Sequence, residues 1–241
     1  MVAAGCTTAV AAPGVAEVQI NVCSEPAQVV RALGLRSAKD ATTVWLFDTA
    51  ALDLHRNGLR LRLRQGGRDE LTLKAAGQDC AKTDKQLLRP DGKCEADLHG
   101  EHLEDVISLS RPLGRHETSP LLTEPAASKE ALADALWALM NEHQRDLLAT
   151  SRRAAGGRLP AGVRALGPSQ VRAYRPPAKG FVVEVWTLPK GQQFVELSQR
   201  ATRDTAIGLR AQLLGRIASA GLTVCTDQQS QAGEKLRLLA E

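Results

Sequence analysis

The stretch LRLRLRQGGRDELTLK, residues 59–74, carries the clearest pattern of this 241-residue chain. Leucine alternates with arginine over residues 59–64, so the leucines point to one face of a β-strand and the arginines to the other. The two glycines at 66–67 predict a tight turn. Residues 71–74 alternate in the same way and place Lys74 on the polar face. The stretch therefore predicts a hairpin with one apolar and one cationic face.

Acidic residues take the corresponding place in other alternating segments. Further period-2 strands are predicted at Val15–Val22, Thr42–Thr49, Cys94–Leu98, Phe181–Trp186 and Phe194–Ser198. Most of their polar faces carry carboxylates, namely Glu17, Glu95, Asp97, Glu184 and Glu196. Apolar residues at helical spacing predict three helices, between Ser24 and Gly34, at about residues 129–148 and at about residues 204–220.

A single strand of this kind is ordinary, because an antiparallel sheet with one solvated face produces the same alternation. Several such strands, with charges of both signs and three helices able to cover the apolar faces, favour another arrangement. If the helices pack outside, the charged faces must turn inward. The sequence therefore predicts an α+β, mainly β fold: a closed antiparallel eight-stranded tunnel barrel with helices packed outside, whose lumen can hold one small ligand.

Such a lumen needs a counter-charge. Parallel arginines on one strand repel each other at close range, so an anion or facing carboxylates must lie beside them. Carboxylates in turn favour hard divalent cations such as Mg²⁺ or Mn²⁺. A polyphosphate together with such a metal satisfies both sets of side chains, which predicts a small, anionic, phosphorylated ligand.

Composition sets limits on the function. The chain is 43% hydrophobic and 24% charged, which is enough for one well-buried domain, placed at residues 15–241. It has no run of about 18 or more apolar residues, so no membrane span is expected. A net charge of only +4 and 3% aromatic residues offer no basic surface interleaved with rings, so no nucleic-acid partner is expected.

The N-terminal residues 1–14 leave the location open. They are small and apolar, and residues 9–11 have the small-x-small form of a secretory cleavage site, although a basic segment is missing before them. These residues are expected to be a disordered tail or the remnant of an export signal. A cytoplasmic location is favoured, and a periplasmic or secreted location is the alternative.

The five cysteines bear on the same alternatives. Without Cys6, which lies in the N-terminal segment, an even four remain. Cys80 and Cys94 flank a predicted hairpin and could bridge it, which would leave Cys23 and Cys225 to pair. Two disulfides would indicate an oxidising compartment, whereas in the cytosol the same residues would be reduced thiols.

Together these segments resemble the CYTH family, also called triphosphate tunnel metalloenzymes. The specific part is LFDTAALDLHRNGLRLRLRQ at residues 46–65 followed by LTLKAAG at 71–77, and EVQINV, CEADL, FVVEVW and FVELS occur in the family's order around it. The resemblance implies an eight-stranded tunnel that binds a triphosphate group. Members include inorganic, thiamine and RNA triphosphatases and class IV adenylate cyclases.

The resemblance also implies roles for individual lumen residues. The phosphate-binding residues would be Arg60, Arg62, Lys74 and Arg153. Glu17 and Glu196 would be the catalytic residues and the ligands of Mg²⁺ or Mn²⁺, and the further lumen carboxylates would be Glu95, Asp97 and Glu184. In the expected reaction, a metal assists attack on a terminal phosphate while the cations stabilise the charge.

The sequence departs from the family mainly on the metal side. The family's first strand reads E-x-E-x-K, but residues 17, 19 and 21 are Glu, Gln and Asn. Phe194 replaces the first carboxylate of a later E-x-E pair, and the C-terminal lysine of the family is matched only by Gln231. Loss of two negative charges weakens a divalent site. The sequence therefore predicts a surviving anion site with a weakened or rearranged metal site.

Three functions follow from these observations. The first is metal-dependent hydrolysis of a triphosphate-containing substrate, inorganic triphosphate or a nucleotide. The second is a non-catalytic CYTH-like protein that binds a phosphorylated or other anionic ligand, and the third is an exported scaffold whose lumen charges only pair with each other. The first function predicts phosphate release in the presence of metal. The second predicts stabilisation by polyphosphate without turnover, and the third predicts neither.

Overall fold

The computed structural model describes residues 14–37, 41–88, 92–123, 129–151, 157–178, 180–228 and 230–241. The strands are β1 (Val15–Val22), β2 (Arg36–Ser37), β3 (Thr42–Asp48), β4 (Leu59–Gln65), β5 (Asp69–Ala76), β6 (Gly92–His99), β7 (His102–Leu113), β8 (Arg164–Arg175), β9 (Val182–Thr187) and β10 (Gln193–Thr202). The helices are α1 (Pro26–Ala32), α2 (Asp53–Arg56), α3 (Arg115–Thr123), α4 (Lys129–Leu139), α5 (Glu142–Thr150), α6 (Ala206–Ser219) and α7 (Ser230–Ala240).

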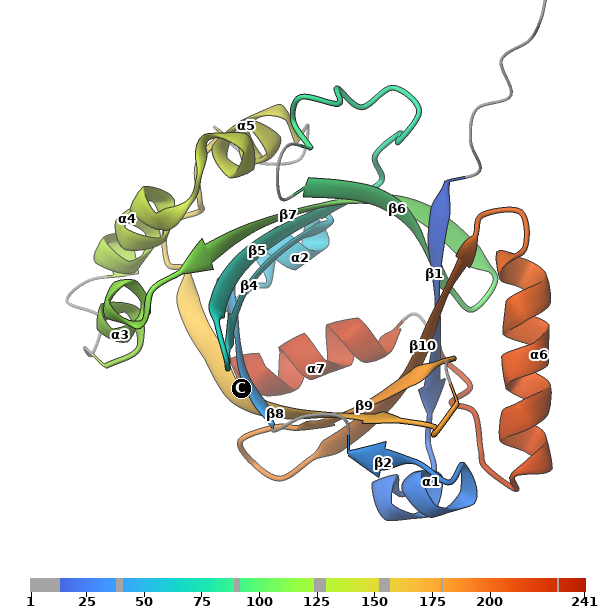
Figure 1. Ribbon diagram of the computed structural model, residues 1–241. Coiled ribbons are helices and arrows are strands. Elements are labelled where there is room, and N and C mark those ends of the chain that lie inside the picture. The colour runs from blue at the N-terminus through green and yellow to red at the C-terminus, as the bar shows by residue number, and fades with distance from the viewer. Residues whose placement is uncertain are drawn as a thin grey trace, which may run out of the picture.

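Nine of these strands close into a barrel, seen end-on in Figure 1. Their order is β8-β3-β4-β5-β7-β6-β1-β10-β9, and β9 pairs back to β8, while β2 pairs with β8 outside the ring. The predicted closed barrel is confirmed, but the predicted eight antiparallel strands are wrong in detail. The barrel is mixed, because β1 and β6 run parallel, with Glu17 opposite Asp97.

The outer face of the barrel carries two hydrophobic cores. The leucines of the β4–β5 hairpin pack with Leu136, Met140 and Leu148 of the α4–α5 region. On the other side, Val18 of β1 and its neighbours pack against α1 and α6 (Figure 1). The apolar faces of these strands and of these helices therefore pack against each other outside the barrel, as predicted.

Helix α7 lies within the outline of the barrel in Figure 1, so the prediction that the helices pack outside is wrong for this helix. Leu236 of α7 is buried in an inner cluster with Val44 and Leu46 of β3, Leu166 and Val171 of β8, and Trp186 of β9. Where α7 covers these strands, their inward residues are mostly apolar. This third core fills one side of the lumen.

The predicted helix over residues 129–148 is two helices. The break falls at Asn141, whose side chain accepts a hydrogen bond from the backbone N–H of Gln144 at 2.8 Å, while the Gln144 side chain bonds back to the Asn141 N–H. This capping box starts a new helix inside a segment whose apolar spacing looked continuous. No helix in the described ranges is long and apolar enough to cross a membrane.

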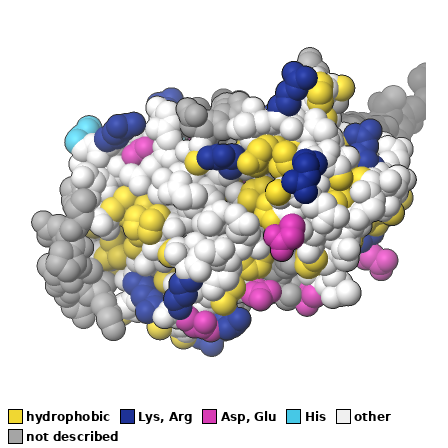
Figure 2. Space-filling model, turned by 90° about the horizontal axis from the view of Figure 1, so that it is seen from below, with side chains coloured by type: hydrophobic (Ala, Val, Ile, Leu, Met, Phe, Trp, Pro, Cys, Tyr) yellow, Lys and Arg dark blue, Asp and Glu magenta, His cyan; other side chains and the backbone are white. Residues whose placement is uncertain are grey.

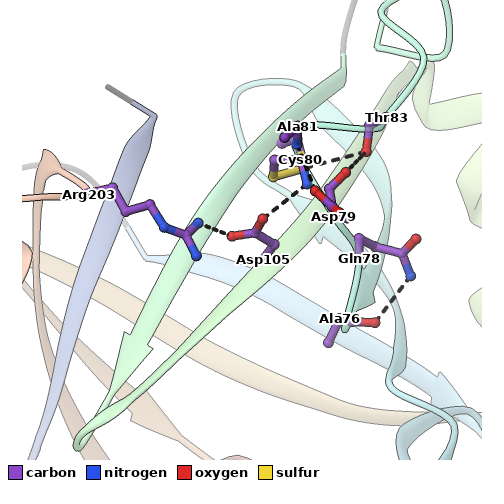
Figure 3. The surroundings of a disulfide bond; sticks show 9 residues. Ala76, Gln78, Asp79, Cys80, Ala81, Thr83, Asp105 and Arg203 are labelled. Carbon is purple, nitrogen blue, oxygen red and sulfur yellow. Dashed lines mark hydrogen bonds and ion pairs between the residues drawn. A yellow bond between two sulfur atoms is a disulfide. The ribbon is translucent and has the colours of Figure 1, made fainter. Parts of the chain in front are cut away.

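Two disulfides form, in the pairing that the sequence suggested: Cys23 with Cys225 and Cys80 with Cys94. Figure 3 shows the surroundings of the second, where the N–H of Cys80 donates to a carboxylate oxygen of Asp105 at 3.0 Å and Asp105 also pairs with Arg203. The loop after β5 is thereby fastened to β6, to β7 and to the end of β10. Disulfides persist in oxidising compartments, which is the setting of the exported alternative.

Candidate functional site: a charged tunnel

The inner faces of the strands line a cavity of about 800 Å³ beside α7. Most of the residues singled out in the sequence line it, namely Glu17, Arg60, Arg62, Lys74, Asp97, Glu184 and Glu196. Glu95 is buried in the wall beside Glu17 and Asp97. Arg153 lies outside the described residues.

Charged side chains of both signs line this cavity. On the outer face shown in Figure 2, basic and acidic side chains are scattered among uncharged ones. In the cavity, strand register places like charges opposite each other at two positions, although Arg64 lies opposite Glu70. Arg60 lies opposite Lys74 on the β4–β5 hairpin, whereas Glu17 lies opposite Asp97 on the parallel β1–β6 pair.

The cationic wall is poorly compensated. Burial, followed by repulsion from Arg64, lowers the pKa of Arg62 to about 9. The Nε atom of Arg62 is buried and makes no hydrogen bond within the described part of the chain. Burial also lowers the pKa of Lys74, although its Nζ lies 3.7 Å from a carboxylate oxygen of Asp97. A buried cation with an unused donor is a group that an anionic ligand can satisfy.

The acidic wall gathers three carboxylates. One oxygen each of Glu17, Glu95 and Asp97 lies within 4.8 Å of the others. Burial raises the pKa of Glu17 above its ordinary value of 4.5, and the charges of Asp97 and Glu95 raise it further, against the opposing effect of Lys74. The Oδ1 atom of Asp97 is buried without a hydrogen-bond partner in the described residues. Oxygen ligands in such a group are the kind that hard divalent cations prefer.

Basic residues already neutralise part of this acidic cluster. Glu95 pairs with Lys93 and, at 3.7 Å, with Arg200. Neither Lys93 nor Arg200 was a candidate from the sequence, because each lies just outside a predicted strand, Cys94–Leu98 or Phe194–Ser198. A metal ion would have to compete with them.

Glu196 lies elsewhere in the tunnel and has a partner that sequence reasoning missed. The Nζ of Lys235, on α7, lies 3.4 Å from a carboxylate oxygen of Glu196. It also lies 5.0 Å from the ring centroid of Trp186 and 5.6 Å from that of Phe194. Burial acts to raise the pKa of Glu196, but Lys235 and the nearby His99 outweigh it, so the pKa falls below 4.5.

Lys235 lies one helical turn beyond Gln231, the residue that the sequence comparison set against the family's C-terminal lysine, and it lines the tunnel cavity. The sequence signal for this lysine was the segment KLRLLA at residues 235–240, in which a short apolar stripe follows Lys235. The ring of Phe194 lies beside the ammonium group of this lysine.

Hydrogen bonds to Asn21 fasten the segment that leads into α7. The N–H of Asn21 donates to Oε1 of Gln228 at 2.7 Å, and its side-chain amide donates to the Gln228 carbonyl at 3.0 Å. The Gln228 amide returns a bond to the Asn21 carbonyl at 3.0 Å. Asn21 thereby anchors this segment close to the Cys23–Cys225 disulfide.

Solved structures share this architecture. A proposed adenylyl cyclase of Hippeastrum, described as having a dominant triphosphatase activity, matches with a TM-score of 0.57 and 16% identity, over 92% of this chain and 95% of that one. A proposed adenylate cyclase of Bacillus halodurans matches with a TM-score of 0.50 and 12% identity, over 91% and 98% of the two chains. Neither a protein-family model nor a curated protein matches the sequence. The likeness shows the fold: this chain shares the closed-barrel architecture of these two solved structures.

Proposed function

We propose that the protein is a CYTH-like tunnel protein that binds a triphosphate-containing compound, inorganic triphosphate or a nucleotide, and hydrolyses it with Mg²⁺ or Mn²⁺. The observation that carries this proposal is the incompletely satisfied cationic wall around Arg62, which faces the same cavity as the acidic cluster. A chain of phosphates can lie along the basic residues while its metal lies against the carboxylates.

Arg60, Arg62 and Lys74 would bind the phosphate oxygens. Their positions on paired strands present donors along one wall, and Arg62 has a donor to spare. Charge-assisted hydrogen bonds to phosphate are among the stronger contacts that a side chain makes. In this role the three residues position the ligand and stabilise the negative charge that develops as phosphate leaves. The predicted contribution of Arg153 stays a prediction.

The acidic cluster fits a divalent cation. Glu17, Glu95 and Asp97 would hold it, since their oxygens converge and one oxygen of Asp97 lacks a partner in the described chain. A bound divalent cation supplies charge stabilisation to phosphate oxygens and acidifies a water molecule. Glu196 is proposed as a further metal ligand or as the group that orients the attacking water together with Lys235; its lowered pKa keeps it ionised at neutral pH.

Binding without turnover is the second candidate, and a specific observation favours it. Glu95 is neutralised by two basic residues and Glu196 by Lys235, so these carboxylates are balanced with no metal present. A weakened metal site beside an intact anion site would give a protein that holds a phosphorylated ligand and does not cleave it.

The test is a phosphate-release assay with inorganic triphosphate and with ATP, each with Mg²⁺, Mn²⁺ or chelator. We expect metal-dependent release that Glu17→Gln and Glu196→Gln abolish and that the exposed control Glu101→Gln retains. Melting temperatures measured with the same ligands separate the alternatives. Stabilisation without release would support the binding function, whereas neither release nor stabilisation would reject both.

A further inference from the structure

A second cavity, of about 460 Å³, opens at one mouth of the tunnel between β2, β8 and β9. Three arginines line it, Arg36, Arg64 and Arg175, together with one carboxylate, Glu184. Arg64 and Glu184 also line the tunnel cavity, so the two spaces adjoin. We call this second space the mouth pocket.

The register shows that Arg36 and Arg175 stand on the inner side of the wall. Val171, Ala173 and Arg175 alternate along β8, and Val171 belongs to the inner core beneath α7. Side chains two residues apart on a strand share a face, so Arg175 points the same way. Arg36 of β2 is the register partner of Arg175 and shares that face. The short strand β2 therefore extends the tunnel wall beyond the closed ring.

The charges of the mouth pocket are unbalanced. Like charges directly opposite each other on paired strands are destabilising. Neither Arg36 nor Arg175 makes an ion pair with any described residue, and Glu184 is already engaged by Arg64 at 3.5 Å. Two facing arginines at a tunnel mouth are stabilised when an anion bridges them.

We propose that the mouth pocket is a second anion subsite, which binds a phosphate group on the part of a ligand that extends out of the tunnel. This inference rests on the proposed function. Glu184 is the register partner of Ala173, and Arg175 lies two residues, about 7 Å of strand, further out. Arg60, Arg62, Arg64 and the Arg36–Arg175 pair thus form a basic path that leads outward. The ligand class is a linear polyphosphate longer than triphosphate.

The test compares inorganic triphosphate with a longer linear polyphosphate of defined length by titration calorimetry, using the full chain. The variant is Arg36→Ala with Arg175→Ala. The matched control is Arg172→Ala, which removes an exposed arginine from the outer face of β8, where Arg172 lies opposite Val185 of an outer core. We expect the double variant to bind the longer chain roughly tenfold more weakly and triphosphate unchanged, which also shows that it is folded.

Equal losses for both ligands, or an equal loss in Arg172→Ala, would overturn the subsite in favour of a general charge effect. If the unaltered protein binds triphosphate but gains nothing from the longer chain, the subsite alone fails. If it binds neither ligand, the proposed function fails and the subsite with it.

Discussion

Two sides of one tunnel are built from similar strands and are filled in opposite ways. On β3, β8 and β9 the inward residues are mostly apolar, and Leu236 of α7 packs on them. On β4, β5, β6 and β1 the inward residues are charged or polar and border an open cavity. Alternation along a strand decides which side chains share a face. What lies opposite that face decides whether it becomes core or binding site.

The largest expected effect comes from the apolar side. Leu236 is 3% exposed, so Leu236→Asp places a carboxylate in the inner core and should lower the free energy of unfolding by about 4 kcal/mol. Arg237→Asp is the matched control, because residue 237 is exposed on the same helix. Urea unfolding of both variants measures the difference. Equal, small effects would mean that α7 does not cover the wall.

The disulfide near α7 should rank next. Cys23→Ser with Cys225→Ser opens a link between residues 202 apart in sequence, and about 3 kcal/mol of stability should be lost. The link between Cys80 and Cys94 spans only 14 residues, so its removal should cost less in the chain-entropy account. Thermal unfolding of the two double variants gives the order. The reverse order would show that the Cys23–Cys225 link does not constrain the fold.

Lys235 lies at the boundary between the two sides, so its removal tests their coupling. Lys235→Met keeps the apolar stem but leaves Glu196 without its cation, and about 2 kcal/mol should be lost because Glu196 is still partly solvated. The pKa of Glu196 should rise, which NMR titration of its carboxyl carbon can follow. A double variant with Glu196→Gln should recover most of the loss. An unchanged pKa would show that the pair is unimportant.

The smallest effect concerns the acidic cluster and depends on pH. Because burial and neighbouring carboxylates raise the pKa of Glu17, folded protein holds this proton more tightly than unfolded protein does. The tighter hold on this proton stabilises the folded state fully below pH 4.5. This stabilisation is lost as the pH rises through the raised pKa of Glu17. At pH 7 without metal, Glu17→Gln should therefore be slightly more stable than the unaltered protein.

Melting temperatures from pH 4 to pH 8 in chelator, with Glu101→Gln as control, check this dependence. The advantage of Glu17→Gln should vanish toward acid pH, and added Mg²⁺ or Mn²⁺ should reverse it, because a metal ligand must be ionised. An advantage that is the same at every pH would contradict the assignment of a raised pKa.

The sequence was most informative where one wall alternates strictly between charge and leucine. Strand β1 was predicted to the residue and β4 to within one residue, because both faces carry an unambiguous signal, whereas β5 extends two residues beyond the prediction at each end. Strand β7 was missed since its inward residues include Val106, Ser108 and Ser110, which break the charged pattern. The alternation of VISLS over residues 106–110 nevertheless indicates a strand there.

Other features depend on contacts between distant parts of the chain, which local patterns do not encode. The parallel pairing of β1 with β6 is set by closure of the barrel. Helix α7 has few apolar residues, and its sequence does not say that they cover an inner wall. Glu17 and Glu196 were expected to share a metal role, but the structure places Glu17 with Glu95 and Asp97 and places Glu196 with Lys235.

The central claim is that the charged side of the tunnel binds a triphosphate through its inward cations. Calorimetric titration of inorganic triphosphate into the unaltered protein, Arg62→Ala and Arg172→Ala tests it most directly. We expect Arg62→Ala to bind about 30-fold more weakly, and Arg172→Ala, which loses an outward arginine, to bind like the unaltered protein. Absence of binding to the unaltered protein, or equal binding by both variants, would contradict the claim.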